Sequence, residues 1–200
     1  KNLEEMKRKT HAGFLVSCVG DRNNFSYVPS RFGKSISDKV ALNVLNNNEP
    51  DFKKYSFLDR GSDQRQFCAP KIDLPVVSIM RSKDGEYPEY HTSLDNMNFI
   101  SPIALCESYE LYKKIITILE KNEKFIVSTK CEPKFSKYDL YPTLSTKNSV
   151  DDKINLMRNV WTYCDGNNDI IDIANIVNAK TEKIIDIVDL LFSKGIIRAF

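Results

Sequence analysis

The sequence has no marked excess of charge of either sign, few glycines and prolines, and no long hydrophobic run. Its 29 Lys and Arg against 27 Asp and Glu exclude a strongly basic nucleic-acid arm and an acidic solvating tail. Seven Gly and eight Pro in 200 residues exclude a low-complexity or fibrous chain. The apolar runs fall short of the ~18 residues of a membrane span, so we expect no membrane partner. We also expect no signal peptide, because no proper hydrophobic region follows the charged residues 1–9.

Cysteine is scarce and scattered. The five cysteines are an odd number, and no two of them form a CxxC pair. These features exclude a zinc ribbon and argue against a secreted disulfide framework. We therefore expect reduced, mostly buried thiols in a cytoplasmic protein. The chain also lacks an initiator Met and enters an apolar run after a short charged segment, which suggests a fragment or a lost N-terminal part.

The first part of the chain alternates between strand and helix patterns. Short apolar runs rich in β-forming residues predict three strands, at 12–19, 55–58 and 76–80. Helical spacing predicts three helices, at 2–9, 37–48 and 101–121. Ser37 is a suitable N-cap for the second helix, and Pro102 stands at the first position of the third. Polar or aperiodic stretches predict loops at 22–34, 61–75 and 86–98. This alternation indicates an α/β layer fold.

The last part of the chain is helical. Helical spacing predicts helices at 150–163, 169–177 and 181–194. Gly195 would end the last helix, and a short strand would begin at Ile196. Helices in this order, joined by a tight turn at 178–180, are typical of a winged helix. We therefore expect an α/β domain over 1–132, an extension and linker over 133–148, and a winged-helix domain over 149–200, with Trp161 in its core or against the larger domain.

Two polar segments are candidates for chemistry. His91 lies in a loop rich in Glu, Tyr and Asp between a predicted central strand and a long helix, where functional sites often lie. Neutral imidazole is the commonest metal ligand, but the spacing alone favours a hydrogen-bonded structural histidine over a metal or catalytic one. The second segment, residues 60–66, follows a predicted strand and could be a solvated turn with a contact between Asp63 and Arg65. His11 has no nearby partner and reads as a surface side chain.

Several segments together resemble a bacterial family of aminopeptidase-like proteins that are often encoded among surface-polysaccharide genes. The two most specific motifs are G-S-D-Q-R-Q at 61–66 and E-Y-H-T-S-L-D at 89–95. Further similar stretches are F-S-Y-V-P-S-R at 25–31, L-P-V-V-S-I-M-R-S at 74–82, C-E-P-K-F at 131–135 and L-Y-P-T-L at 140–144. The resemblance covers essentially the whole chain.

The resemblance implies a fold and a set of site residues. It implies the C-terminal half of a zinc-exopeptidase-like three-layer α/β/α domain, followed by a small winged-helix domain. In the wider zinc aminopeptidase and glutaminyl cyclase superfamily the histidine of the H-T motif is a zinc ligand, which carries over to His91. The Ser-Asp pair carries over to Ser62 and Asp63, with Asp63 in the active site beside the metal-bound water or the substrate amine. Glu89, Tyr90 and Arg65 are the candidate substrate-binding residues.

The resemblance also shows what is missing. A zinc site needs about three protein ligands and an open water position, and this chain supplies one clear ligand, His91. The family's other ligands and its general-base Glu precede the segment seen here, so we expect the chain alone to be inactive. Two functions stay open: a zinc-dependent aminopeptidase-like hydrolase that cleaves an N-terminal peptide or amide bond, and a non-catalytic peptidase-fold scaffold in surface-polysaccharide biosynthesis. Glu86 and Glu89 could instead form loop salt bridges to Arg31, Arg60 or Arg81.

The charge of the predicted winged helix argues against a duplex partner. Residues 149–200 hold six Lys and Arg and eight Asp and Glu, a net charge of −2. The helix that would enter a DNA groove carries Glu182, Asp186 and Asp189. DNA binding needs several cations on one face to neutralise phosphates. We therefore expect a protein contact or homo-oligomer through this domain rather than DNA binding.

Overall fold

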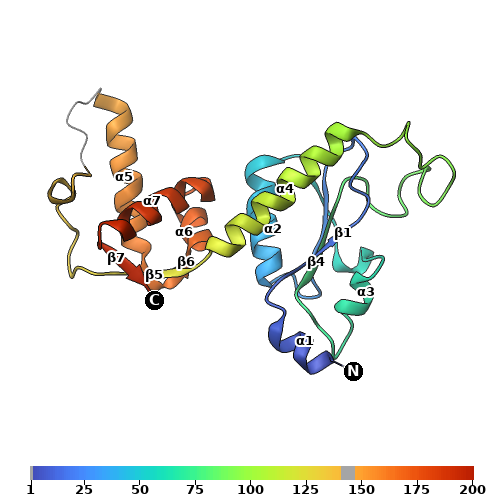
Figure 1. Ribbon diagram of the computed structural model, residues 1–200, viewed down its shortest axis with the longest axis horizontal. Coiled ribbons are helices and arrows are strands. Elements are labelled where there is room, and N and C mark those ends of the chain that lie inside the picture. Colours follow the sequence, from blue (N-terminus) through green and yellow to red (C-terminus); the bar gives the residue numbers. More distant parts are fainter. Residues whose placement is uncertain (1, 141–146) are drawn as a thin grey trace. The chain divides into compact units, whose positions relative to one another are not determined.

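The chain folds into two compact units, Lys1–Ile116 and Thr117–Phe200. The computed structural model describes residues 2–140 and 147–200, and the side chains of all of these except 147–151. Each unit has its own sheet, and Figure 1 labels the helices and most of the strands. In the described residues no helix is both long and apolar enough to span a membrane.

The first unit is built on a four-stranded mixed sheet in the order β1-β4-β2-β3. Its strands are β1 (Gly13–Val16), β2 (Ser26–Val28), β3 (Lys53–Lys54) and β4 (Val76–Met80). β1 pairs parallel to β4, and β2 pairs antiparallel to β4. Every residue of β4 is buried, as expected of a β-branched apolar run at the centre of a sheet.

Helices lie on both faces of this sheet. The helices of this unit are α1 (Leu3–Lys9), α2 (Ile36–Asn48), α3 (Gln64–Phe67) and α4 (Pro102–Lys121), whose last residues, from Thr117, belong to the second unit. Figure 1 shows α2 and α4 on one side of the strands and α3 on the other, which agrees with the expected α/β fold. The Tyr112 hydroxyl of α4 donates to the carbonyls of Leu15 and Ile79, 3.0 and 2.5 Å away, and so fastens α4 to β1 and β4.

The start of α2 is held by a buried carboxylate. Ser35, not the expected Ser37, caps the helix and forms a capping box with Asp38. Asp38 also accepts from the Tyr27 hydroxyl at 2.5 Å and from the Ser30 amide at 2.9 Å. Burial would raise the pKa of Asp38, but the hydrogen bonds from Ser30, Ser35 and Tyr27 outweigh it and lower that pKa. Ser37 instead donates to the Pro75 carbonyl and accepts from the Gly13 amide.

Three stretches of the first unit differ from the sequence-based prediction. The strand predicted at 55–58 is wrong: the 3₁₀ helix η1 (Phe57–Asp59) forms there, capped by Ser56, and Leu58 is 82% exposed. The predicted loop 22–34 contains β2, which is buried on both faces although polar residues flank it. The predicted loop 61–75 contains α3.

The second unit contains a three-stranded antiparallel sheet in the order β6-β5-β7. Its strands are β5 (Lys124–Val127), β6 (Asp165–Asp169) and β7 (Ile197–Ala199). Its helices are α5 (Lys147–Tyr163), α6 (Ile170–Ile176) and α7 (Thr181–Ser193). Their apolar faces meet in a core that includes Ile173, Ile184 and Leu191, and Trp161 packs partly buried against that core, as expected.

The second unit reaches further towards the N-terminus than the expected domain boundary at 149. β5 pairs with both β6 and β7, so residues 124–127 form the central strand of this unit's sheet. The 3₁₀ helix η2 (Phe135–Tyr138) follows, and Phe135 is 1% exposed within the same core. Residues 133–140 therefore pack as part of the unit, whereas 141–146, in the predicted linker, lie outside the described residues.

Candidate functional site

The two predicted site segments meet beside the end of β4. The chain leaves β4 at Met80 and turns through Asp84 and Gly85, while the other segment passes through Gly61 just before α3. A Cβ atom built on Gly61 would lie 1.8 Å from Oδ2 of Asp84. The glycine therefore allows the two loops to touch, which a side chain at this position would prevent.

A buried glutamine anchors the segment that carries Asp63. Gln64 is fully buried, and its Nε2 donates to the carbonyl of Pro29 at 2.8 Å and more weakly to those of Val28 and Val76. Its Oε1 accepts from the Ser78 hydroxyl at 3.1 Å. These bonds fix the four-residue helix α3 against β4 and the end of β2. Sequence reasoning missed Gln64, because nothing in a polar run distinguishes the inward-facing residue.

Asp63 and Arg65 both point into solvent from this anchored turn. Asp63 immediately precedes α3 and makes no side-chain capping bond. The Arg65 side chain donates through Nε to the Ser62 carbonyl at 3.3 Å, in place of the expected alternative contact with Asp63. Ser62 has a φ of +44°, in the left-handed region that costs a non-glycine residue energy. The turn thus presents a carboxylate and a guanidinium to solvent from a fixed backbone.

The loop that carries His91 is ordered by stacked rings. The Tyr87 ring stacks on Phe99 with centroids 5.4 Å apart and meets the edge of Tyr90 at 5.5 Å. The Tyr90 ring in turn stacks on the His91 imidazole at 4.0 Å, with only 13° between the planes. His91 is exposed and has a φ of +57°. Phe99, Tyr87, Tyr90 and His91, here called the aromatic ladder, therefore hold an imidazole in solvent without burying it.

The tyrosines of the ladder stay protonated at physiological pH. Burial, and then the hydrogen bond and charge of Cys18, raise the pKa of Tyr87. Burial and the charge of Asp84 raise the pKa of Tyr90. Both phenols are therefore neutral hydrogen-bonding groups; that of Tyr87 is engaged with Cys18, and that of Tyr90 belongs to the ring stacked on His91.

The carboxylates of the loop do not make the alternative salt bridges considered above. Arg31 pairs with Asp73 at 3.7 Å, and Arg81 pairs with Glu107 at 2.5 Å. Glu86 accepts a hydrogen bond from the Tyr55 hydroxyl at 2.6 Å. Glu89 is half-buried, and its backbone carbonyl accepts from the amide and the hydroxyl of Thr92.

The described residues do not make up a zinc site by themselves. Across 2–140 and 147–200, no group of three or more His, Cys, Asp and Glu side chains is placed to hold a metal ion. Within the same residues, Asp63 and His91 share no hydrogen bond, ion pair or ring contact. The arrangement offers one exposed imidazole and, on a neighbouring loop, one exposed carboxylate. A zinc ion held by His91 would take its other ligands from outside the described residues.

Known proteins resemble the chain over almost its full length. Residues 1–122 match the model of a family described as a domain of unknown function (DUF4910), and residues 124–199 match a winged helix-turn-helix model. The chain is 33% identical, over 172 residues, to a Clostridium acetobutylicum protein named "Putative polysaccharide biosynthesis protein with aminopeptidase-like domain". That similarity covers 86% of this chain and 39% of the relative.

A solved structure has the same fold. A crystal structure titled as a putative peptidase from Clostridium acetobutylicum matches with a TM-score of 0.86 at 30% identity. The match covers 98% of this chain and 44% of that one. The chain thus spans about two fifths of the length of these relatives.

Proposed function

The chain belongs to the DUF4910 family. Because it also resembles a relative named for an aminopeptidase-like domain, we propose that it forms part of the active site of a zinc-dependent hydrolase. The substrate class is a peptide or a small amide with a free amine. In this proposal His91 is a zinc ligand and Asp63 acts beside it in the site. Glu89, Tyr90 and Arg65 bind the substrate.

One observation carries this proposal: His91 is exposed on a loop that the aromatic ladder holds in place. A structural histidine would be expected to have its ring nitrogens satisfied by protein partners, whereas among the described residues the His91 ring is held by its stack on Tyr90. A ligand must reach a metal ion with a set orientation, and a stack at 4.0 Å restricts the imidazole before the metal binds. The contact between Gly61 and Asp84 supports a place for Asp63 on the same side of the unit.

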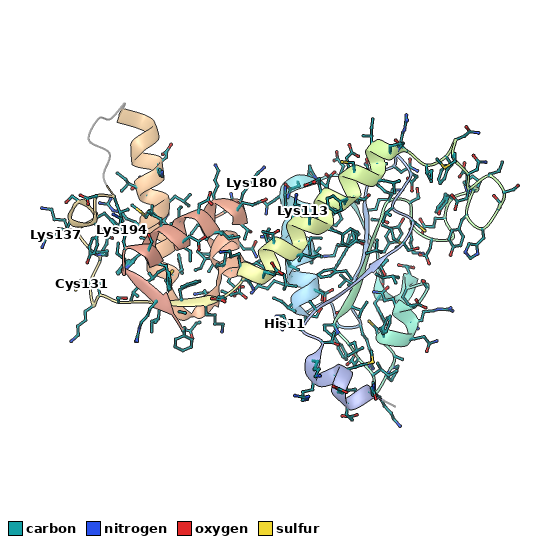
Figure 2. All side chains as sticks on the ribbon, in the orientation of Figure 1. His11, Lys113, Cys131, Lys137, Lys180 and Lys194 are labelled. Atoms are coloured by element: carbon teal, nitrogen blue, oxygen red, sulfur yellow. The ribbon has the colours of Figure 1, made fainter. Side chains whose placement is uncertain are left out.

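The test is the zinc content of the protein expressed from its complete gene. His91→Ala should weaken zinc binding by at least about tenfold, since loss of even an outer-shell partner of a ligand costs that much. His11→Ala is the matched control, because His11 is the other histidine of the chain and is exposed just after α1, as labelled in Figure 2. Equal zinc content in the parent protein and both variants would remove His91 as a ligand.

A second function, a non-catalytic scaffold in surface-polysaccharide biosynthesis, has one observation in its favour. The Clostridium acetobutylicum relative is named for polysaccharide biosynthesis as well as for its aminopeptidase-like domain. The same zinc measurement separates the two functions. A complete protein that binds no zinc and releases no amine from aminoacyl substrates would be a scaffold.

We also propose that the second unit contacts protein, including a second copy of this chain, rather than DNA, and that the protein acts in the cytoplasm. The acidic residues Glu182, Asp186 and Asp189 of α7 support the proposed protein contact.

The five cysteines support the proposed cytoplasmic location. All are free, and the two that are fully buried, Cys68 and Cys164, have their pKa raised by burial and so stay as thiols.

A further inference from the structure

The first unit contains a polar cavity of about 410 Å³ beside the end of β4. Neither Asp63 nor His91 lines it. The cavity lies where β4 ends and where β2 and β3 begin: Ser26 of β2 and Lys53 of β3 line it, together with Arg81, the first residue after β4. Four of its lining residues are cationic and one is a carboxylate. The lining residues are Arg22, Asn23, Asn24, Ser26, Lys53, Tyr55, Arg81, Ser82, Lys83, Glu86 and Tyr87.

Two of the cations are held in the wall. Arg81 is 6% exposed, and its guanidinium donates to the Asn23 carbonyl, the Ser108 hydroxyl and the Glu107 carboxylate while stacking over the Phe25 ring. The Lys83 ammonium lies 3.5 Å from the Asp84 carboxylate. These two side chains shape the cavity, but acidic partners already balance their charges.

The other two cations are available to a ligand. Arg22 and Lys53 are exposed at the cavity, and neither has an ion-pair partner among the residues that the structure describes. The single lining carboxylate, Glu86, is occupied by the Tyr55 hydroxyl at 2.6 Å and lies 4.0 Å from Lys83. The uncompensated charge facing the cavity is therefore positive.

The polar wall next to Arg22 is rigid. Asp21 is buried, and its carboxylate accepts from the Asn23 amide at 2.9 Å and from the Ser82 amide and hydroxyl at 3.1 and 3.0 Å. The side-chain amide of Asn23 donates to Ser82 at 2.7 Å. This network ties the loop before β2 to the turn after β4. A ligand would therefore meet a preformed surface, which lowers the entropic cost of binding.

We propose that this cavity binds the oxyanion group of a small molecule, a phosphate or a carboxylate, between Arg22 and Lys53. Both side chains donate charge-assisted hydrogen bonds to such groups, and Asn24 and Ser26 add neutral polar groups to the same wall. This site does not depend on zinc or on the proposed hydrolase activity. Tyr87 lines the cavity and also belongs to the aromatic ladder. The loop that carries His91 therefore contributes one wall of the oxyanion site.

The test is an NMR titration of the chain, at constant ionic strength, with inorganic phosphate in one series and malonate in another. Saturable shifts of the backbone amides of 22–26 and 81–83 are expected in at least one series, and the series that saturates identifies the oxyanion. Lys53→Gln and Arg22→Gln should each weaken that binding roughly tenfold, the effect of one charge-assisted hydrogen bond.

Lys54→Gln is the matched control, because Lys54 is the next residue of β3, is exposed, and does not line the cavity. It removes the same charge and should change the affinity by less than about twofold. Saturation by neither anion would overturn the proposal. So would equal losses in Lys53→Gln and Lys54→Gln, because attraction would then come from the general surface charge. A folded spectrum with unshifted amides far from the cavity checks that each variant keeps its structure.

Discussion

The two units of this chain are stabilised in different ways. The first unit buries polar side chains, including Asp21, Asp38, Gln64 and Arg81, and each of these has hydrogen-bond partners. The core of the second unit is a cluster rich in isoleucine. Buried polar networks fix one geometry because each unmet partner is costly, whereas apolar packing is less directional. The unit that carries the candidate site is therefore the one whose side-chain positions are fixed by directional hydrogen bonds.

The largest expected effect on stability comes from a substitution that breaks the polar network of the first unit. Asp38→Ala should lower the stability of that unit by roughly 4 kcal/mol, because Tyr27, Ser30 and Ser35 lose a shared buried acceptor. Hydrogen exchange of β2 and β4 amides would measure the loss, with amides of α7 unaffected. The exposed Asp51→Ala should change it by less than about 0.5 kcal/mol. Equal loss of protection in both units would show that they do not unfold separately.

The same carboxylate makes the first unit sensitive to acid. The folded chain lowers the pKa of Asp38 below its usual 3.8, so the unfolded chain binds this proton first as the pH falls. The stabilisation is complete above the usual pKa and is lost as the pH drops through the lowered value of the folded state. Protection of β2 and β4 should therefore fall in this acid range in the parent chain, and Asp38→Ala should remove that dependence.

An apolar truncation tests the second unit. Ile184 is fully buried, so Ile184→Ala should cost roughly 3 kcal/mol by leaving a cavity in the core. Trp161, the single tryptophan of the chain, belongs to this unit, and its fluorescence during urea unfolding reports on that unit alone. Ile176→Ala makes the same chemical change at a side chain that is 47% exposed, and should cost less than about 1 kcal/mol. Similar shifts in both variants would contradict the assigned core.

The smallest expected effect is on nucleic acid. A gel-shift titration of the chain with duplex DNA at low salt should show nothing tighter than the non-specific level of about 10⁻⁴ M. Glu182, Asp186 and Asp189 on α7 would place negative charge against the phosphates. Sub-micromolar binding that weakens with salt would reverse this and give the second unit a regulatory role.

Patterning predicted the elements that are long or strongly apolar. The helices α2, α4, α5 and α7 follow from the periodicity of their apolar residues, and β4 follows from its short apolar, β-branched run. β6, with the sequence D-G-N-N-D, contains no strong β-former and is a strand because β5 pairs with it. β2 has three residues and α3 four, so each is too short for a period to emerge.

The candidate site was predictable only in part, because its residues are recognised by type and its geometry depends on contacts distant in sequence. The loops of Asp63 and His91 were identified from their motifs. The Gln64 anchor depends on carbonyl groups of β2 and β4 that are remote along the chain. The oxyanion cavity combines Arg22, Lys53 and Lys83 from three separate segments, so no local motif encodes it.

The close approach of Gly61 to Asp84 brings two loops into direct contact beside the end of β4. The Asp84 carboxylate lies against the Gly61 backbone, and Asp84 follows Lys83 of the cavity wall. Any backbone movement that carries Asp63 towards or away from a substrate must therefore displace Asp84 or open a gap beside it.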